Sequence, residues 1–156
     1  DEVFWTYVRK IFDDCLRAGA IDEDERARFL QFYEDWWHVV DHDVEPRLLH
    51  LDLWSANILV QNGQISGILD FDRGMYGDPE LEFAVLDTYG NTTPRFFDGY
   101  GAGRPRGQAA RTRRHLYLVY EIIKYAFIRM ARGGSRSTAR DFVRKCFRIL
   151  EQNPAF

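Results

Sequence analysis

The chain has 156 residues, of which 46% are apolar and 15% aromatic, and its net charge is −3. This size and composition suit one globular domain with its own core. The longest apolar stretch, residues 116–128, is interrupted by Glu121 and Lys124, so we expect no membrane-spanning segment. The two cysteines are far apart and lack metal-binding spacing, which favours free thiols. We therefore expect a soluble, cytoplasmic protein without a membrane partner.

Charge is distributed unevenly along the chain. Residues 1–100 carry 8 Lys and Arg against 21 Asp and Glu, whereas residues 101–156 carry 13 against 3. A basic segment can favour nucleic acid, but these arginines are spread around helices rather than interleaved with exposed aromatic side chains. We therefore expect no nucleic-acid partner and interpret the basic residues as helix surface. The acidic half gives weak support for a cationic substrate.

The first 45 residues show the periodicity of two amphipathic helices. Apolar residues recur every three to four positions over 2–18 and again over 22–40. Gly19 is suited to end the first helix, and Asp22 with Glu25 three residues later forms a capping box at the start of the second. Pro46 ends any helical continuation.

The next segment is the only convincing β region. Short apolar runs occupy residues 48–53, 58–60 and 65–71, and Asn62-Gly63 between the last two predicts a hairpin turn. The helical pattern then returns, and we predict helices over 79–88, 94–100, 108–132 and 136–151. The sequence thus predicts an α+β fold that is mostly helical, as a single domain over residues 1–156.

The β region contains a group of oxygen-bearing side chains. The run His50-Leu51-Asp52-Leu53-Trp54-Ser55-Ala56-Asn57 is followed by Ile68-Leu69-Asp70-Phe71-Asp72. Phosphoryl transfer needs a base for the acceptor hydroxyl and oxygen ligands for a divalent metal. Asp52 is suited to be the base, with Asn57 and Asp70 as metal ligands, Asp70 being placed on the returning strand. We assign His50 to bracing the catalytic loop.

Residues 48–84 resemble a known family of enzymes. The run Leu48 to Val60, the run Gly67 to Asp72 and the run Tyr76 to Ala84 closely resemble the aminoglycoside phosphotransferase family. Fructosamine kinases and choline or homoserine kinase relatives share much of the pattern. The Leu-Trp-Ser-x-Asn run is most similar to fructosamine kinases, whereas the Leu-Asp-Phe-Asp and Gly-Asp-Pro segments are more similar to the aminoglycoside group.

The resemblance implies the C-terminal lobe of a protein-kinase-like fold, with a small β-hairpin element that carries the catalytic loop. It implies Asp52 as catalytic base, Asn57 and Asp70 as Mg²⁺ ligands, and ATP or GTP as phosphoryl donor. Nothing in the chain resembles the family's N-terminal nucleotide-binding lobe. The glycine-rich run of residues 99–103 follows no strand, so we interpret it as a loop. We expect the missing lobe to be needed as a partner.

Two positions depart from the family pattern. Leu51 stands where the family usually has glycine, and Glu82 stands where it usually has aspartate. Asp78 and Asp72 are expected to support the site. Asp78 can either orient the loop after Asp70 or cap the helix that begins at Pro79, and we favour the structural role.

The acceptor of the phosphoryl group is less well indicated. Glu80, Asp87, Asp98 and Glu121 are candidate anions for an amine-bearing acceptor, but we favour the interpretation of each as a solvated surface residue. The leading hypothesis is phosphoryl transfer to a hydroxyl of an aminoglycoside or related amino sugar. A fructosamine or other metabolite kinase is the first alternative, and a non-catalytic, pseudokinase-like binding module is the second.

Overall fold

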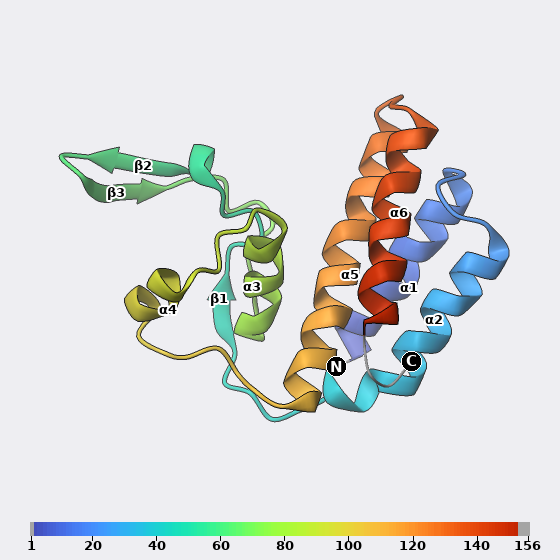
Figure 1. Ribbon diagram of the computed structural model, residues 1–156. Coiled ribbons are helices and arrows are strands. Elements are labelled where there is room, and N and C mark those ends of the chain that lie inside the picture. Colours follow the sequence, from blue (N-terminus) through green and yellow to red (C-terminus); the bar gives the residue numbers. More distant parts are fainter. Residues whose placement is uncertain (1, 153–156) are drawn as a thin grey trace. The chain divides into compact units, whose positions relative to one another are not determined.

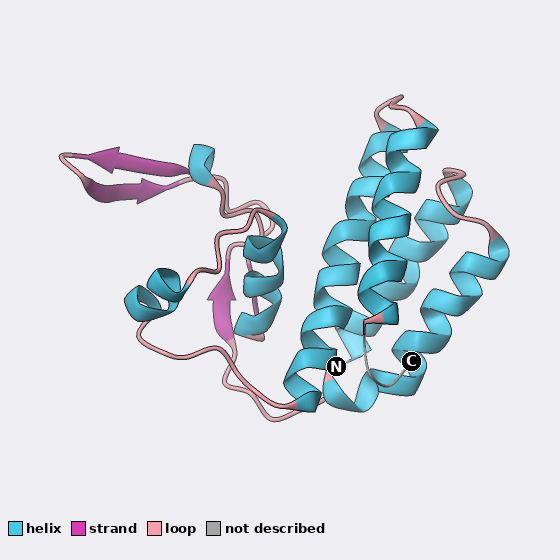
Figure 2. Ribbon diagram, in the orientation of Figure 1, coloured by secondary structure: helices cyan, strands magenta, loops and turns pink. Residues whose placement is uncertain are grey.

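The computed structural model describes residues 2–152, and most of them are helical (Figure 2). The chain forms two compact units. One is the helical unit, which comprises the chain up to residue 42 and again from residue 106, and the other is the inserted unit of residues 43–105. A single domain can contain two compact units, so the single domain expected over residues 1–156 stays a prediction.

The helical unit contains four long helices. They are α1 (Glu2–Arg17), α2 (Glu23–Trp36), α5 (Gln108–Ala131) and α6 (Arg136–Glu151), and the short 3₁₀ helix η1 (Trp37–Val39) continues α2. Helix α5 contacts α1, α2, α6 and η1, so it is the centre of this unit (Figure 1). All four helices match the ranges predicted from apolar periodicity, apart from the last residues of the second.

Local signals explain where these helices begin and end. In α1 the buried residues Phe4, Val8, Phe12 and Cys15 are three or four positions apart and form one face. Gly19 follows with a positive φ of 72°. At the start of α2, Glu25 N–H donates to the Asp22 carboxylate at 2.9 Å and Asp22 N–H donates to the Glu25 carboxylate at 3.1 Å. The predicted capping box is therefore confirmed.

Aromatic side chains fill the core of the helical unit. The Phe29 ring stacks on Phe12 and Phe147, with centroids 4.8 and 4.4 Å away. The buried Tyr33 hydroxyl donates to the Leu116 carbonyl at 2.5 Å, and burial raises the pKa of Tyr33 well above its usual value. These contacts join α1, α2, α5 and α6 through one apolar interior.

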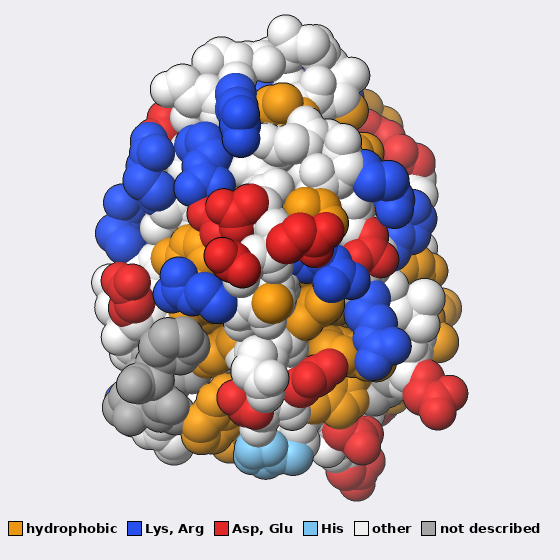
Figure 3. All heavy atoms as spheres, turned by 90° about the vertical axis from the view of Figure 1, so that its right-hand side faces the viewer, with side chains coloured by type: hydrophobic (Ala, Val, Ile, Leu, Met, Phe, Trp, Pro, Cys, Tyr) orange, Lys and Arg blue, Asp and Glu red, His pale blue; other side chains and the backbone are white. Residues whose placement is uncertain are grey.

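Basic residues of the helical unit lie among acidic ones. Figure 3 shows Lys and Arg side chains interspersed with Asp and Glu on one face of the molecule. Arg140 donates to both Glu25 oxygens at 2.5 and 2.6 Å, and this hydrogen bonding raises the pKa of Arg140. The interpretation of the basic C-terminal segment as ordinary helix surface fits this arrangement. Among residues 2–152, no helix is long and apolar enough to cross a membrane.

The inserted unit contains two pairs of short antiparallel strands. Strand β1 (Arg47–Leu49) pairs with β4 (Met75–Gly77), and β2 (Ile58–Gln61) pairs with β3 (Gln64–Ile68). The 3₁₀ helix η2 (Ser55–Asn57) precedes β2, and helices α3 (Pro79–Thr88) and α4 (Pro94–Tyr100) follow β4. Helix α3 packs against β1. The loop between β1 and β2 carries the sequence motif.

The β2–β3 hairpin confirms the turn predicted at Asn62-Gly63. Both residues have positive φ, 53° and 75°, as a two-residue turn of type I′ requires. Strand β4 was not predicted, because three residues are too few for a periodic pattern.

The extents predicted for the first and third β segments were wrong. Strand β1 ends at Leu49 because Leu51 takes a positive φ of 61°, and β3 ends at Ile68 because Asp70 takes a positive φ of 67°. Asp70 therefore lies in a loop, not on the returning strand. Left-handed residues cannot continue an extended strand.

Candidate active site

The loop of residues 50–57, between β1 and β2, begins with a left-handed leucine. Leu51 has a φ of 61° and is 7% exposed. For a residue with a side chain, this backbone region costs about 1–2 kcal/mol relative to the right-handed one. Such strain persists where surrounding contacts over-determine the conformation, and it concentrates at functional sites.

The contact that holds this strained turn comes from helix α3. One oxygen of Glu82, Oε2, accepts hydrogen bonds from the N–H groups of His50 at 2.6 Å and Leu51 at 2.8 Å. Hydrogen bonds to a carboxylate are short and strong. The sequence singled out Glu82 only as a departure from a pattern, and no local signal showed what its carboxylate contacts.

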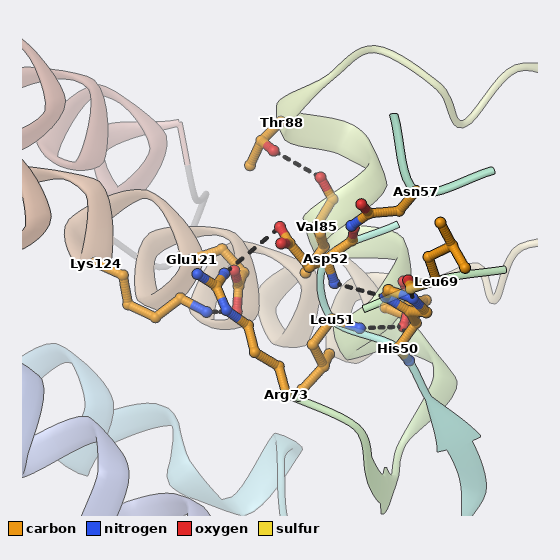
Figure 4. Close-up of polar contacts among 11 residues, drawn as sticks. His50, Leu51, Asp52, Asn57, Leu69, Arg73, Val85, Thr88, Glu121 and Lys124 are labelled. Carbon is orange, nitrogen blue, oxygen red and sulfur yellow. Dashed lines mark hydrogen bonds and ion pairs between the residues drawn. The ribbon is translucent and has the colours of Figure 1, made fainter. Parts of the chain in front are cut away.

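His50 connects the loop to the segment that follows β3. Its Nε2 lies 2.7 Å from the Leu69 carbonyl oxygen, and its Nδ1 accepts from the Asp52 N–H at 3.3 Å (Figure 4). A carbonyl only accepts and an N–H only donates, so these contacts fit the neutral ring protonated on Nε2. The ring also lies against Phe71, with centroids 4.3 Å apart. Both ring nitrogens are thus used to hold backbone.

Asn57 ties the two ends of the loop together. It is 8% exposed, and its Nδ2 donates to the Asp52 carbonyl at 2.9 Å. Its own carbonyl accepts from the Leu69 N–H at 2.9 Å. Because Nδ2 is used in this way, Oδ1 is the side-chain atom left to bind another group.

Asp70 follows directly after this tether. Leu69 bonds to Asn57 through its N–H and to His50 through its carbonyl, so the backbone just before Asp70 is held on both sides. The Asp70 side chain is exposed, and within residues 2–152 no hydrogen bond or ion pair involves it. The structure therefore joins Asp52, Asn57 and Leu69, the residue before Asp70, in one hydrogen-bonded assembly.

Asp52 has a cationic neighbour that the sequence reading missed. Its Oδ1 lies 3.6 Å from an Arg73 guanidinium nitrogen, and the Arg73 side chain is 37% exposed (Figure 4). Ion pairs as exposed as this one are weak, typically below about 1 kcal/mol. Arg73 lies in the loop before β4, and a single arginine there carries no recognisable pattern.

The comparisons with known proteins agree with the motif. The model of the family described as fructosamine kinase matches residues 17–149. The chain belongs to the fructosamine kinase family. A probable ketoamine kinase of Synechocystis is 30% identical over 109 residues, which cover 70% of this chain and 36% of that protein. A probable ketoamine kinase of Vibrio cholerae is 32% identical over 88 residues, 56% of this chain and 30% of that protein.

This member of the fructosamine kinase family thus spans about a third of the length of those two relatives. A probable ketoamine kinase of Klebsiella pneumoniae is 31% identical over 91 residues, 58% of this chain and 72% of that protein. The crystal structure of a thermostable mutant of aminoglycoside phosphotransferase APH(4)-Ia, apo form, matches with a TM-score of 0.65 and 20% identity. The match covers 88% of this chain and 48% of the other. The predicted kinase-like α+β fold is confirmed.

The two supporting aspartates differ in this family member. Asp78 is the N-cap of α3, where its Oδ1 accepts from the Glu80 N–H at 2.9 Å and Pro79 takes the first helical position. This is the structural role favoured from the sequence. Asp72 is exposed, and in the part of the chain that the structure describes its carboxylate has no hydrogen bond or ion pair.

Two of the four candidate substrate anions are buried. Glu80 is 3% exposed and Glu121 is 1% exposed, so the solvated-surface interpretation of these two is wrong. Glu121 lies in the helical unit, where the Lys124 ammonium donates to it at 2.6 Å. The half-buried Asp87 accepts from the Arg104 guanidinium and the Thr92 hydroxyl. Asp98 alone of the four is exposed, on α4.

The oxygen donors of Asn57 and Asp70 fit Mg²⁺. This cation prefers oxygen ligands, takes only one or two protein carboxylates, and completes its shell with water and substrate phosphates. The Asn57 Oδ1 and the Asp70 carboxylate are one neutral and one anionic oxygen donor of that kind. Residues 2–152 contain no group of three or more His, Cys, Asp or Glu that could hold a metal ion.

Proposed function

We propose that this chain is the catalytic lobe of an ATP- and Mg²⁺-dependent kinase that phosphorylates a sugar hydroxyl of a ketoamine, the glycated form of an amine. The observation that carries the proposal is the double tether at Leu69, which joins the Asp70 segment to His50 and Asn57. The relatives' names support a ketoamine acceptor, which was the first alternative from the sequence, better than an aminoglycoside.

Asp52, Asn57 and Asp70 would each have a separate role in the reaction. Asp52 would accept the proton of the acceptor hydroxyl. Because the ion pair between Asp52 and Arg73 is weak, that hydroxyl could take the place of Arg73 beside the Asp52 carboxylate. Asn57 and Asp70 would hold Mg²⁺, which neutralises charge on the transferred phosphoryl group when it is bound. Asp52 is aimed by its own backbone, because its N–H donates to His50 and its carbonyl accepts from Asn57.

A nucleotide-binding lobe would complete the enzyme. Neither compact unit of the chain contains a sheet of more than two strands, within the residues that the structure describes. We therefore expect the purified 156-residue chain to show little Mg²⁺-dependent consumption of ATP or GTP. Robust nucleotide turnover by this chain alone would contradict the proposed need for a second lobe.

The acceptor is tested by mass spectrometry. The longest encoded chain that contains these residues is incubated with ATP, Mg²⁺ and separate panels of glycated amines and aminoglycosides. We expect one phosphoryl group to be added to glycated amines, and product formed from aminoglycosides only would overturn the ketoamine proposal.

Asp52→Asn tests the catalytic role within the same assay. Loss of the base should lower kcat by about 10²–10⁴-fold while the fold is kept. Asp24→Asn, at an exposed position of α2, is the matched control and should leave kcat unchanged. If glycated amines bound both Asp52→Asn and the unaltered protein equally, and neither formed product, the non-catalytic binding module would be the better description.

A further inference from the structure

Helix α4 is a short helix on the surface of the inserted unit. None of residues 94–100 is buried, and loops lead into and out of the helix (Figure 1). Gly90 and Gly107, which lie outside this segment on either side, have positive φ of 71° and 100°. A helix this short is unstable by itself in water, so its conformation depends on contacts with the chain around it.

Aromatic contacts attach α4 to α3. The buried Phe83 ring of α3 lies edge-on to the rings of Phe97 and Tyr100, with centroids 5.3 and 5.2 Å away. Phe96 also meets Phe83 edge-on at 5.9 Å and stacks on Tyr100 at 6.0 Å. The three rings of α4 thus cover Phe83, but they stay partly exposed themselves. Partly exposed rings remove less apolar surface from water than buried ones, so this attachment is weak by itself.

A single carboxylate holds the chain on both sides of α4. Asp87, in the last turn of α3, accepts from the Thr92 hydroxyl before α4 and from two guanidinium nitrogens of Arg104 after it, one of them at 3.1 Å. The side chains of Asp87 and Arg104 are 17% and 22% exposed, so salt screens this pair less than an exposed pair. The Arg104 guanidinium also lies over the Phe97 ring, 5.7 Å from its centroid. Arg104 therefore contacts both α3 and α4.

These contacts make the segment around α4 a separate element of the inserted unit. We propose that residues 92–104 form a strap that opens and closes as one unit over Phe83, with the ion pair between Asp87 and Arg104 as its clasp. Thr92 and Arg104 flank α4 and share one acceptor, so loss of the Asp87 contacts releases both ends of the strap together. Segments that open locally to admit a ligand come from such weakly buried parts of a protein.

The strap should open without disturbing the proposed site. The loop of residues 50–57 is held by bonds from His50, Asn57 and Glu82, and none of these bonds involves the strap. Opening of the strap is also measured without a substrate. The inference therefore stands or fails whether or not the protein phosphorylates a ketoamine.

Hydrogen exchange of the isotope-labelled 156-residue chain, followed amide by amide with NMR, tests the clasp. The Phe97 N–H donates to the Thr93 carbonyl and the Gly101 N–H to the Phe97 carbonyl, so these two amides report opening of the strap. Arg104→Gln removes the charge of the clasp and should speed their exchange about 10-fold or more. Arg95→Gln removes the same charge from an exposed position of α4 and should change their exchange by less than about twofold.

A second pair of measurements tests whether the clasp acts through Asp87 and whether the strap is separate from the site. In the Asp87→Asn background, Arg104→Gln should speed exchange by less than about threefold, because its partner is already altered. The Asn57 and Leu69 amides, which are bonded within the site, should keep their exchange rates in every variant.

Two outcomes would overturn the inference. Unchanged exchange of the α4 amides in Arg104→Gln would show that the ion pair is no clasp, and faster exchange of Asn57 and Leu69 together with α4 would show that the strap is no separate unit. If Arg104→Gln fails to fold, Arg104→Lys, which keeps the charge but loses the paired bonds, replaces it and is judged by the same two outcomes.

Discussion

The His50 side chain uses both of its ring nitrogens to bond to backbone groups of two different segments. Its ring holds the Asp52 N–H and the Leu69 carbonyl, and it packs on Phe71. Each bond uses a different nitrogen, so no other side chain of similar shape can replace both. The imidazole therefore serves as a structural connector between two loops that are distant in sequence.

Replacing His50 with phenylalanine should separate these roles. His50→Phe keeps an aromatic ring against Phe71 but removes both hydrogen bonds. We expect the free energy of unfolding to fall by about 1–3 kcal/mol. Urea denaturation followed by circular dichroism measures this, with the exposed His38→Phe as the control. An unchanged unfolding midpoint would show that the two bonds add nothing to stability.

A second histidine, His115 of α5, makes stability depend on pH. Burial lowers the pKa of His115, and the neighbouring Arg114 and Arg111 lower it further. Between the lowered folded pKa and the usual value near 6.5, the unfolded chain binds more protons than the folded one. The contribution of neutral His115 to the free energy of unfolding is therefore fully present above pH 6.5, and it is lost as the pH falls towards the lowered pKa.

We expect the free energy of unfolding to decrease from pH 7 to pH 5, and this decrease to be smaller in His115→Gln. Denaturation midpoints of the two proteins over that range measure the difference. Identical pH profiles would show that His115 does not contribute to the decrease.

Among the elements, the β2–β3 hairpin depends most on one turn. Strand pairs of this length are marginal on their own in water, so their stability relies on the loop that joins them. Asn62 and Gly63 both take positive φ there, and a Cβ added at Gly63 would meet no heavy atom within 4 Å. The cost of a side chain at Gly63 would therefore be purely conformational.

Gly63→Ala and Gly99→Ala form a matched pair of substitutions. An added Cβ is unobstructed at both positions, but only Gly63 has a positive φ, and Gly99 lies within helix α4. Gly63→Ala should destabilise the hairpin by about 1 kcal/mol, whereas Gly99→Ala should be neutral or stabilise by up to about 1 kcal/mol. Amide hydrogen exchange of β2 and β3 resolves the first effect. Equal exchange rates in the two variants would refute it.

At the scale of the whole molecule, the core of the helical unit hides both cysteines. Cys15 and Cys146 are buried, and their thiols contact the carbonyls of Ile123 and Val119 on α5. Burial raises the pKa of Cys15 to about 12, with a further increase from Asp14, and burial also raises that of Cys146. The reactive thiolate is therefore suppressed while the protein is folded.

Thiol labelling should consequently report unfolding. At pH 8 we expect both thiols to react with an aromatic disulfide reagent only as fast as the helical unit opens, and completely in urea. The pKa values of both thiols are raised in the folded protein. Their contribution to the free energy of unfolding is therefore fully present below pH 9 and is lost as the pH rises above it. Rapid labelling in the absence of urea would contradict the burial of the pair.

The features that could be predicted from the sequence are those with local causes. The capping box of Asp22 and Glu25 and the Asn62-Gly63 turn each involve residues a few positions apart, so their pattern is visible in the chain. The spacing of Asp52, Asn57 and Asp70 is likewise visible in the sequence itself. The ends of the strands were less predictable. Leu51 and Asp70 both take positive φ, and neither is a glycine, so the sequence gives no signal for a left-handed residue at these positions.

What the sequence alone determined about this protein is therefore its helices, its hairpin turn and the order of its functional groups. Only the tertiary structure decided that Glu82 holds Leu51, that Arg73 approaches Asp52, and that Glu80 and Glu121 are buried. The physical reason is range. Capping and turn formation depend on neighbouring residues, whereas burial and hydrogen bonds between distant segments depend on how the whole chain packs.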